Sequence, residues 1–376
     1  MAQISGNGCI RLFLGGDVMT GRGIDQILPH PSSPELYESD VRSARTYVEL
    51  AEQVSGPIPR PADFGYVWGD ALAVLDRLRP DVRIVNLETA VTCSDEAWPD
   101  KGIHYRMSPA NVGCLVSARI GCCVLANNHV LDWGRAGLAQ TLGTLHDAGI
   151  VTAGAGRNEA EAAQPAILER ADGTRVLIFA VAHSGSGVPP DWCAAGAISG
   201  VQRIADFSAR TVGAIAARIA NARRPADVVV LSIHWGGNWG YRIARTERDF
   251  AHALVDVAGV DVVHGHSSHH PKAIEAYAGK LILYGCGDLL NDYEGIGGYE
   301  AYRSDLALMY FADIDRRGCD LAALTLVPVR MRKFRIERAS REASDWLCAT
   351  LARESAAFGT TIGFGEDGTL LLQFAR

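Results

Sequence analysis

The sequence predicts an α/β protein built on a largely parallel sheet, with antiparallel strands in its C-terminal third. Short apolar runs alternate with amphipathic stretches of helical periodicity, a pattern typical of parallel strands joined by helical crossovers. The chain has 376 residues, of which 48% are hydrophobic and 21% are charged. This balance supplies enough apolar side chains for a buried core, so disorder and a fibrous structure are excluded as the dominant state.

Six apolar runs in the first 263 residues are predicted to be strands, at 11–16, 82–87, 122–126, 176–181, 228–233 and 260–263. Four amphipathic stretches between them are predicted to be helices, at 68–78, 109–118, 135–148 and 247–258. After His270 the apolar runs follow one another without helices, at 273–278, 280–285, 306–313 and 321–329. Turns such as Ala278-Gly279 indicate antiparallel pairs, which would form a second sheet packed on the first. A helix at 339–357 and a hairpin around Glu366-Asp367-Gly368 end the chain.

The chain shows no internal repeat and no long linker, so we expect a single domain over residues 9–376. Residues 25–63 are rich in proline and polar side chains and are expected to form an insertion that caps one edge of the sheet. Residues 316–376 are expected to form a C-terminal extension made of a helix and a hairpin.

The charge and cysteine content limit the partners and the compartment. Lys and Arg number 36 against 43 Asp and Glu, a net charge of −7 without the basic surplus of nucleic-acid-binding proteins. No segment approaches the ~20 consecutive apolar residues that span a bilayer, and no signal peptide is recognisable. Nine cysteines without a C-x-x-C pair are typical of free thiols in a reducing compartment. We therefore expect a cytoplasmic protein with no membrane segment and no nucleic-acid partner, of unknown oligomeric state.

Five predicted strands end in residues that bind metals or transfer protons. These ends are Gly16-Asp17, Asn86-Leu87-Glu88, Asn127-Asn128-His129, Ile233-His234 and Gly265-His266-Ser267-Ser268-His269. Ligands of open α/β sheets bind at the carboxyl ends of strands, so these side chains are expected to converge at one edge. A single such residue is more often a turn or a structural histidine, but five in the same position favour a site. Carboxylates, an amide oxygen and imidazoles form a mixed set that suits divalent Mn, Fe or Zn.

The same residues resemble the calcineurin-like metallophosphatase superfamily and, more closely, the CapA (poly-γ-glutamate capsule synthesis protein) family within it. The similarity spans residues 12–315 in collinear order and is carried by Gly16-Asp17-Val18-Met19-Thr20-Gly21-Arg22, Asn86-Leu87-Glu88-Thr89, Tyr105-Arg106-Met107-Ser108-Pro109, Ala126-Asn127-Asn128-His129 and Ile233-His234-Trp235-Gly236. Three positions differ from the metallophosphatase pattern. Met19 replaces a histidine, Glu88 replaces a bridging aspartate, and Gly-His-Ser-Ser-His replaces Gly-His-x-His.

The resemblance implies a four-layer αββα sandwich of metallophosphatase type with the site on one edge. It implies one or two divalent ions with the candidate ligands Asp17, Glu88, Asn128, His234, His266 and His269. His129 would be the general acid or an anion-stabilising residue. Arg22 and Arg106 would bind an anionic substrate, although a surface salt bridge explains either arginine equally well. Trp235 and Trp239 would either form a platform for a peptide substrate or pack in the core.

The implied function is metal-assisted hydrolysis of a phosphoester or amide in an anionic or peptidic, poly-γ-glutamate-like substrate, with Asp17, His129 and His234 as catalytic residues. Two alternatives stay open. An acid–base pair of Asp17 and a histidine can move a proton at an α-carbon, which suits a peptide epimerase that needs no metal. A degenerate site would instead belong to a non-catalytic accessory protein of polymer or capsule synthesis. The segments 284–288 and 291–294 are expected to add acidic groups near the same edge, which would support the ligands or contact the substrate, and a structural turn is the default explanation for their glycines.

Overall fold

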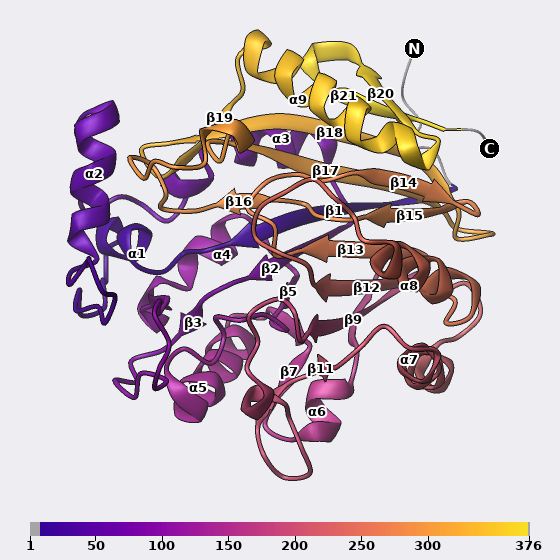
Figure 1. The fold of residues 1–376 in the computed structure, drawn as a ribbon, viewed down its shortest axis with the longest axis horizontal. Helices are drawn as coiled ribbons and strands as arrows, with labels where there is room; N and C mark the ends of the chain where they lie inside the picture. The colour runs from indigo at the N-terminus through magenta and orange to yellow at the C-terminus, as the bar shows by residue number, and fades with distance from the viewer. Residues whose placement is uncertain (1–7, 375–376) are drawn as a thin grey trace.

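A computed structural model describes residues 8–374 and contains two large β-sheets with helices on their outer faces (Figure 1). Within the described residues the first sheet has ten strands. Eight lie in the order β20 (Thr361–Phe364), β21 (Leu370–Gln373), β18 (Leu321–Arg332), β17 (Leu306–Asp315), β1 (Cys9–Val18), β2 (Val82–Leu87), β5 (Cys122–Val124) and β6 (Val151–Ala153). The other two are β16 (Asp288–Leu290), beside β1, and β19 (Arg335–Arg338), beside β18.

The second sheet has seven strands in the same described range. Six lie in the order β11 (Arg203–Ile204), β9 (Arg175–His183), β12 (Val228–His234), β13 (Val262–His266), β15 (Lys280–Leu283) and β14 (Ile274–Tyr277), and β8 (Ala166–Glu169) pairs with β9. Two short pairs stand apart, β3 (Ala90–Val91) with β4 (Arg106–Met107) and β7 (Ala155–Gly156) with β10 (Gly200–Val201).

The sheets stack because successive side chains of a strand point to opposite faces. In β12, Val230 joins Leu12 and Leu14 of β1 in a core that includes both sheets. Its neighbours Val229 and Leu231 pack instead in a second core with helices α7 (Ala209–Ala222) and α8 (Arg245–Asp256). The second sheet is therefore buried on both faces, between the first sheet and these two helices.

Other helices complete the large core that includes the first sheet. They are α3 (Asp70–Leu78), α4 (Gly113–Ser117), α5 (Gly134–Asp147) and α9 (Arg341–Ser355). Helix α9 contacts β18 and β20 of the first sheet and also β14 of the second. The short helix α6 (Glu159–Ala163) packs on β7. Helices, two sheets and helices together form four layers, which confirms the predicted αββα class.

Two expectations about the sheets were wrong. The antiparallel C-terminal strands do not form a sheet of their own, because β14 and β15 extend the second sheet while β17 and β18 extend the first. Each antiparallel pair forms backbone hydrogen bonds with a strand from the earlier part of the chain: β15 pairs with β13, and β17 pairs with β1. The predicted parallel strands are also divided, with β1, β2 and β5 in one sheet and β9, β12 and β13 in the other.

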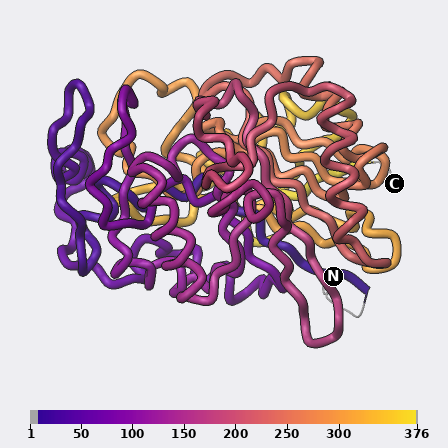
Figure 2. The backbone as a smooth tube through the Cα atoms, turned by 90° about the horizontal axis from the view of Figure 1, so that it is seen from below, coloured from indigo at the N-terminus to yellow at the C-terminus, as the bar shows by residue number. Residues whose placement is uncertain are grey.

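The segment expected to cap the sheet contains α2 (Arg45–Ser55), which packs against α1 (Gly23–Ile27). Both helices lie together at one end of the molecule in two perpendicular views (Figure 1, Figure 2). The predicted C-terminal helix and hairpin correspond to α9 and to β20 with β21. Every helix in residues 8–374 is too short or too polar to cross a lipid bilayer. The nine cysteines are free thiols, most of them buried.

Candidate metal centre

The carboxyl ends of strands from both sheets meet in one buried cluster. The first sheet supplies Asp17 in β1, Glu88 directly after β2, and the half-buried Asn128 in the loop after β5. The second sheet supplies His234 and His266, the last residues of β12 and β13. Contacts across the two sheets are short: Asp17 Oδ1 lies 3.7 Å from His266 Nδ1, and Asn128 Oδ1 lies 3.0 Å from His234 Nε2. The side chains predicted to converge therefore do so, although at the seam between two sheets rather than along one.

The two histidines face each other. His234 and His266 are register partners in parallel strands, and their Nδ1 atoms are 2.8 Å apart. Burial lowers the pKa of both imidazoles well below the ordinary value, so both rings are neutral at physiological pH. A neutral imidazole has one nitrogen lone pair that can bind a metal. Two such rings meeting at one point form a nitrogen-rich site next to the Asp17 carboxylate.

Among the residues that the structure describes, no lysine or arginine pairs with the carboxylates of the centre. Asn86 Nδ2 donates to Asp17 Oδ1 at 2.8 Å and to Glu88 Oε2 at 3.2 Å. Burial, together with the charge of Asp288, raises the pKa of Asp17 to about 7. Burial, with Asp17 nearby, raises the pKa of Glu88 well above its ordinary value. Among the described residues, Asp17, Glu88 and Asp288 form ion pairs only with histidines, and such buried charge is costly unless it is protonated or bound to a cation.

Two groups of side chains are compact enough to hold one cation each. Asp17, His234 and His266 form the first group, and Asp17, His269 and Asp288 form the second. Within each group the ligand atoms lie within 4.8 Å of one another. Glu88 adjoins the first group, with Oε1 3.9 Å from His234 Nε2. Oxygen and imidazole donors together suit a divalent transition metal, so the donor set fits the predicted ion.

His129 lies beside these groups rather than within them. Its Nδ1 is 2.7 Å from Asp132 Oδ2, and its Nε2 is 3.9 Å from Glu88 Oε1. Lys101 Nζ binds the other oxygen of Asp132 at 2.8 Å. Burial lowers the pKa of His129 to about 4, although Asp132 acts in the opposite direction. The neutral ring therefore donates Nδ1–H to Asp132 and leaves Nε2 unprotonated.

Asp132 and Lys101 were not predicted from the sequence. Asp132 had a local signal, because it follows His129 by three residues at the turn after β5. Lys101 lies in an irregular segment between β3 and β4, where no periodicity marks it.

The cluster lines a cavity of about 580 Å³. Polar side chains of the centre line it, including Glu88, Asn128, His129, His234 and His269. Aromatic and aliphatic side chains also line it, including Ile103, Tyr105, Trp239, Tyr293, Ile296 and Tyr299. The rings of Trp239 and Tyr299 are stacked, with centroids 3.9 Å apart.

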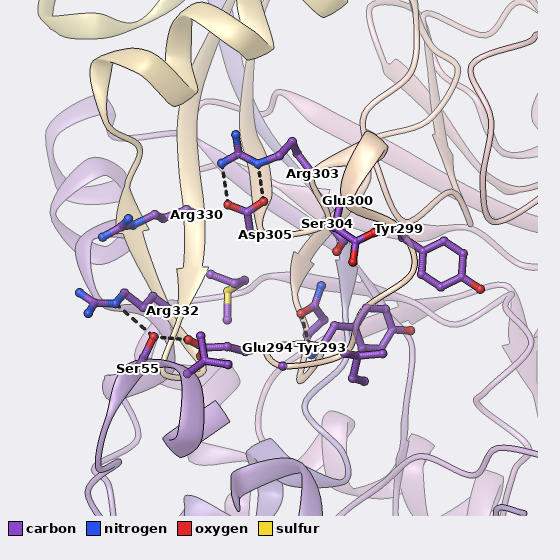
Figure 3. A pocket seen from close by; sticks show the side chains of 15 residues that line it. Ser55, Tyr293, Glu294, Tyr299, Glu300, Arg303, Ser304, Asp305, Arg330 and Arg332 are labelled. Carbon is purple, nitrogen blue, oxygen red and sulfur yellow. Dashed lines mark hydrogen bonds and ion pairs between the residues drawn. The ribbon is translucent and has the colours of Figure 1, made fainter. Parts of the chain in front are cut away.

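A second cavity of about 400 Å³ shares Tyr293, Ile296, Tyr299 and Ser304 with the first (Figure 3). Arg303 and Asp305 pair with each other at its wall, and Ser55 of α2 donates a hydrogen bond to Glu294. Its polar groups are thus largely engaged within the chain.

The four residues predicted to contact substrate have different positions. Arg22 borders the larger cavity, but its guanidinium is held by Asp292 and Glu38. Arg106 pairs with Asp95 and lies over the Trp133 ring, outside that cavity. Both arginines thus form salt bridges, although the bridge of Arg22 with Asp292 is buried rather than at the surface.

The two tryptophans also differ in position, one in the core and one at the cavity. Trp235 is buried in the second core, next to α7 and α8, where its Nε1 donates a hydrogen bond to Tyr284 O at 2.9 Å. Trp239 lines the larger cavity, so it is the aromatic residue of the pair that a substrate can reach.

The fold and the site together define an αββα protein with a buried carboxylate–imidazole centre. The chain belongs to the family described as Bacterial capsule synthesis protein PGA_cap, which matches residues 11–293. The predicted membership of the CapA family is thereby confirmed.

The chain is also similar to individual proteins. A probable polyglutamine synthesis accessory protein of Mycobacterium tuberculosis is 46% identical over 362 residues, 96% of this chain and 95% of that protein. The PGA biosynthesis protein CapA of Bacillus subtilis is 26% identical over 279 residues, 74% of this chain and 62% of that protein. A solved structure of a phosphatase from Mycoplasma pneumoniae aligns with a TM-score of 0.49 at 11% identity, covering 89% of this chain and 95% of that one.

Proposed function

We propose that this protein is a metal-dependent hydrolase that cleaves a phosphoester or amide bond in an anionic, peptidic substrate of the poly-γ-glutamate kind. The observation that carries the proposal is the convergence of Asp17, His234 and His266 in a compact, buried group next to a cavity large enough for a small-molecule or peptide fragment. The names of the relatives, which refer to capsule, PGA and polyglutamine synthesis, support a polymer as the substrate.

Asp17, His234 and His266 would hold the cation, with Glu88 and Asn128 beside them. When bound, a divalent cation polarises the scissile group and makes water a nucleophile at neutral pH. His129 would act as the general acid that donates a proton to the leaving group. Its Nε2 is free to take up a proton when an anionic substrate group lies beside it, because a nearby negative charge favours the imidazolium form. Asp132 keeps the ring oriented through Nδ1.

The cavity wall supports a peptidic substrate. Trp239 and Tyr299 present stacked aromatic rings at the cavity, with the Trp239 ring 5.3 Å from that of His269, and Ile103 and Ile296 are 44% and 40% exposed at the same cavity. Flat amide groups and methylene chains pack well on such surfaces, whereas a small inorganic anion makes no use of them. The anionic groups of the substrate would point to the centre.

The peptide-epimerase alternative draws on one observation. The pKa of Asp17 is raised to about 7, mainly by burial, so this carboxyl can exchange a proton near neutral pH. An epimerase would use Asp17 with one of the facing histidines and would need no cation.

One experiment separates these functions. Protein purified without chelator is incubated in deuterated water with p-nitrophenyl phosphate and with a short γ-glutamyl peptide, with and without EDTA. Cleavage of either compound that EDTA abolishes and Mn²⁺ or Zn²⁺ restores supports the hydrolase. Deuterium at an α-carbon without cleavage, unaffected by EDTA, contradicts it and identifies an epimerase. Neither reaction, in a protein that still binds the peptide, contradicts both and indicates an accessory protein.

A further inference from the structure

Asp17 and Asp288 lie side by side because β16 pairs in parallel with β1, with these two residues in register. The backbone N–H of Asp17 donates to Gly287 O at 3.0 Å. A Cβ atom on Gly16 would lie 1.8 Å from that same oxygen, so the two strands approach closely only because residue 16 is glycine. The Gly16-Asp17 and Gly287-Asp288 dipeptides therefore bring two carboxylates to one point.

We infer that Asp288 is a metal ligand, which with Asp17 and His269 forms a second cation position that shares Asp17 with the first. The inference rests on the metal centre of the proposed function but not on the reaction. Met19, where the resemblance leads one to expect a histidine, is fully buried, and its sulfur accepts a hydrogen bond from Tyr293. Asp288 reaches the same carboxylate from the neighbouring strand and supplies the donor that Met19 lacks.

The charge balance around Asp17 favours a cation at this position. Asp17 and Asp288 are 0% and 4% exposed, and neither pairs with a lysine or arginine in the described chain. Arg22 borders the same cavity but is held by Asp292 and Glu38. His269, with Nδ1 2.9 Å from Asp288 Oδ1, can supply at most one positive charge. A divalent cation balances both carboxylates and satisfies their remaining lone pairs.

A positioning role for Asp288 is the competing explanation. Metal-binding histidines commonly donate their second ring N–H to a carboxylate, and Asp288 could hold His269 in that way. Asn291 Nδ2 already donates to Asp288 Oδ2 at 2.9 Å, which fixes the carboxylate plane. The substitution Asp288→Asn separates the two roles, because an amide oxygen still accepts from His269 but lacks the charge of a strong ligand.

The experiment counts bound ions. Chelator-treated and dialysed protein is equilibrated with Mn²⁺, passed through a desalting column and analysed for manganese per chain and by electron paramagnetic resonance. We expect two ions in the wild-type chain and a spin-coupled spectrum, since both ions share the Asp17 carboxylate. Asp288→Asn is expected to bind one ion with an uncoupled spectrum. The matched control Asp313→Asn, which alters a buried aspartate of β17 that pairs with Arg11, is expected to keep two.

One ion in the wild-type protein, or two coupled ions in Asp288→Asn, overturns the inference. If Asp288→Asn loses its native circular dichroism, His269→Gln takes its place, with the same expected drop from two ions to one. Two coupled ions in a protein that cleaves neither test compound would leave this inference standing while contradicting the proposed function.

Discussion

His234 and His266 stand opposite each other on neighbouring parallel strands, with only 2.8 Å between their Nδ1 atoms. The carboxylate that completes the group, Asp17, comes from the other sheet and lies 3.7 Å from His266. Neither sheet contains the centre by itself. Stacking of the sheets through the shared apolar core is therefore what assembles the candidate site.

The role of His129 is tested by the substitution His129→Gln. Hydrolysis is expected to fall by about 10²–10⁴-fold, the usual contribution of a general acid–base group. The metal content should stay unchanged, because His129 lies outside both ligand groups. Both quantities are measured on one preparation, and a parallel loss of bound metal would show that His129 is a ligand instead. Asp132→Asn, which removes the charge that orients Nδ1, should lower kcat with little change in KM.

Substitutions of the two tryptophans after β12 are expected to have different effects, one on stability and the other on substrate binding. Trp235→Ala should lower the free energy of unfolding by about 3–5 kcal/mol, because its buried ring leaves a large void. Trp239→Ala should change stability much less and should raise KM, since this ring lines the cavity. Urea denaturation and steady-state kinetics of the two variants check this. Similar stability losses in both would place Trp239 in the core rather than at the substrate.

Arg22 is expected to stabilise the fold rather than bind substrate. Its guanidinium is held by two carboxylates, Asp292 and Glu38, so Arg22→Met leaves both without compensation. The expected loss is about 3–5 kcal/mol, the usual cost of breaking a buried ion pair. The control Arg245→Ala, at a side chain that is 92% exposed, should stay within about 0.5 kcal/mol of wild type. A stable Arg22→Met variant with weakened substrate binding would instead support the original substrate-binding expectation.

The stability of the cation-free protein is expected to rise with pH between about 4 and 6.5. Burial lowers the pKa of His129, His264 and His270 from 6.5 to about 4. Within this window the unfolded chain binds protons that the native chain does not, so acid favours unfolding. Asp17 has the opposite effect: its pKa is raised to about 7, so the native state keeps a proton that the unfolded state loses. Burial also raises the pKa of Glu88, Asp25 and Asp261, which act in the same sense as Asp17. Burial lowers the pKa of His183, His234 and His266, which act with the three histidines. The histidines with lowered pKa values are the more numerous, so the urea midpoint should be higher at pH 6.5 than at pH 4. A decrease would contradict this balance.

Much of the site could be predicted because five of its residues follow apolar runs. Asp17, Glu88, Asn128, His234 and His266 follow runs whose ends are visible in the sequence, and parallel strands place such ends together. The division into two sheets could not be predicted. Strand β12 is buried on both faces and is apolar at nearly every position, so it carries no alternation that shows which sheet it joins.

Contacts between side chains far apart in the sequence could not be predicted either. Arg22 pairs with Asp292, 270 residues away, so no local pattern shows that its guanidinium is occupied. Asp288 reaches Asp17 only through the pairing of β16 with β1. Lys101 reaches His129 from a segment without regular structure.

The metal content of protein purified without chelator tests the proposed metal-dependent hydrolase most directly. We predict stoichiometric Mn, Fe or Zn in the wild-type protein, and its loss in Asp17→Asn, which removes the ligand common to both groups. Asp313→Asn serves as the matched control and should retain the metal. A wild-type protein that contains none of these metals, and takes up none when they are added, would contradict the proposal.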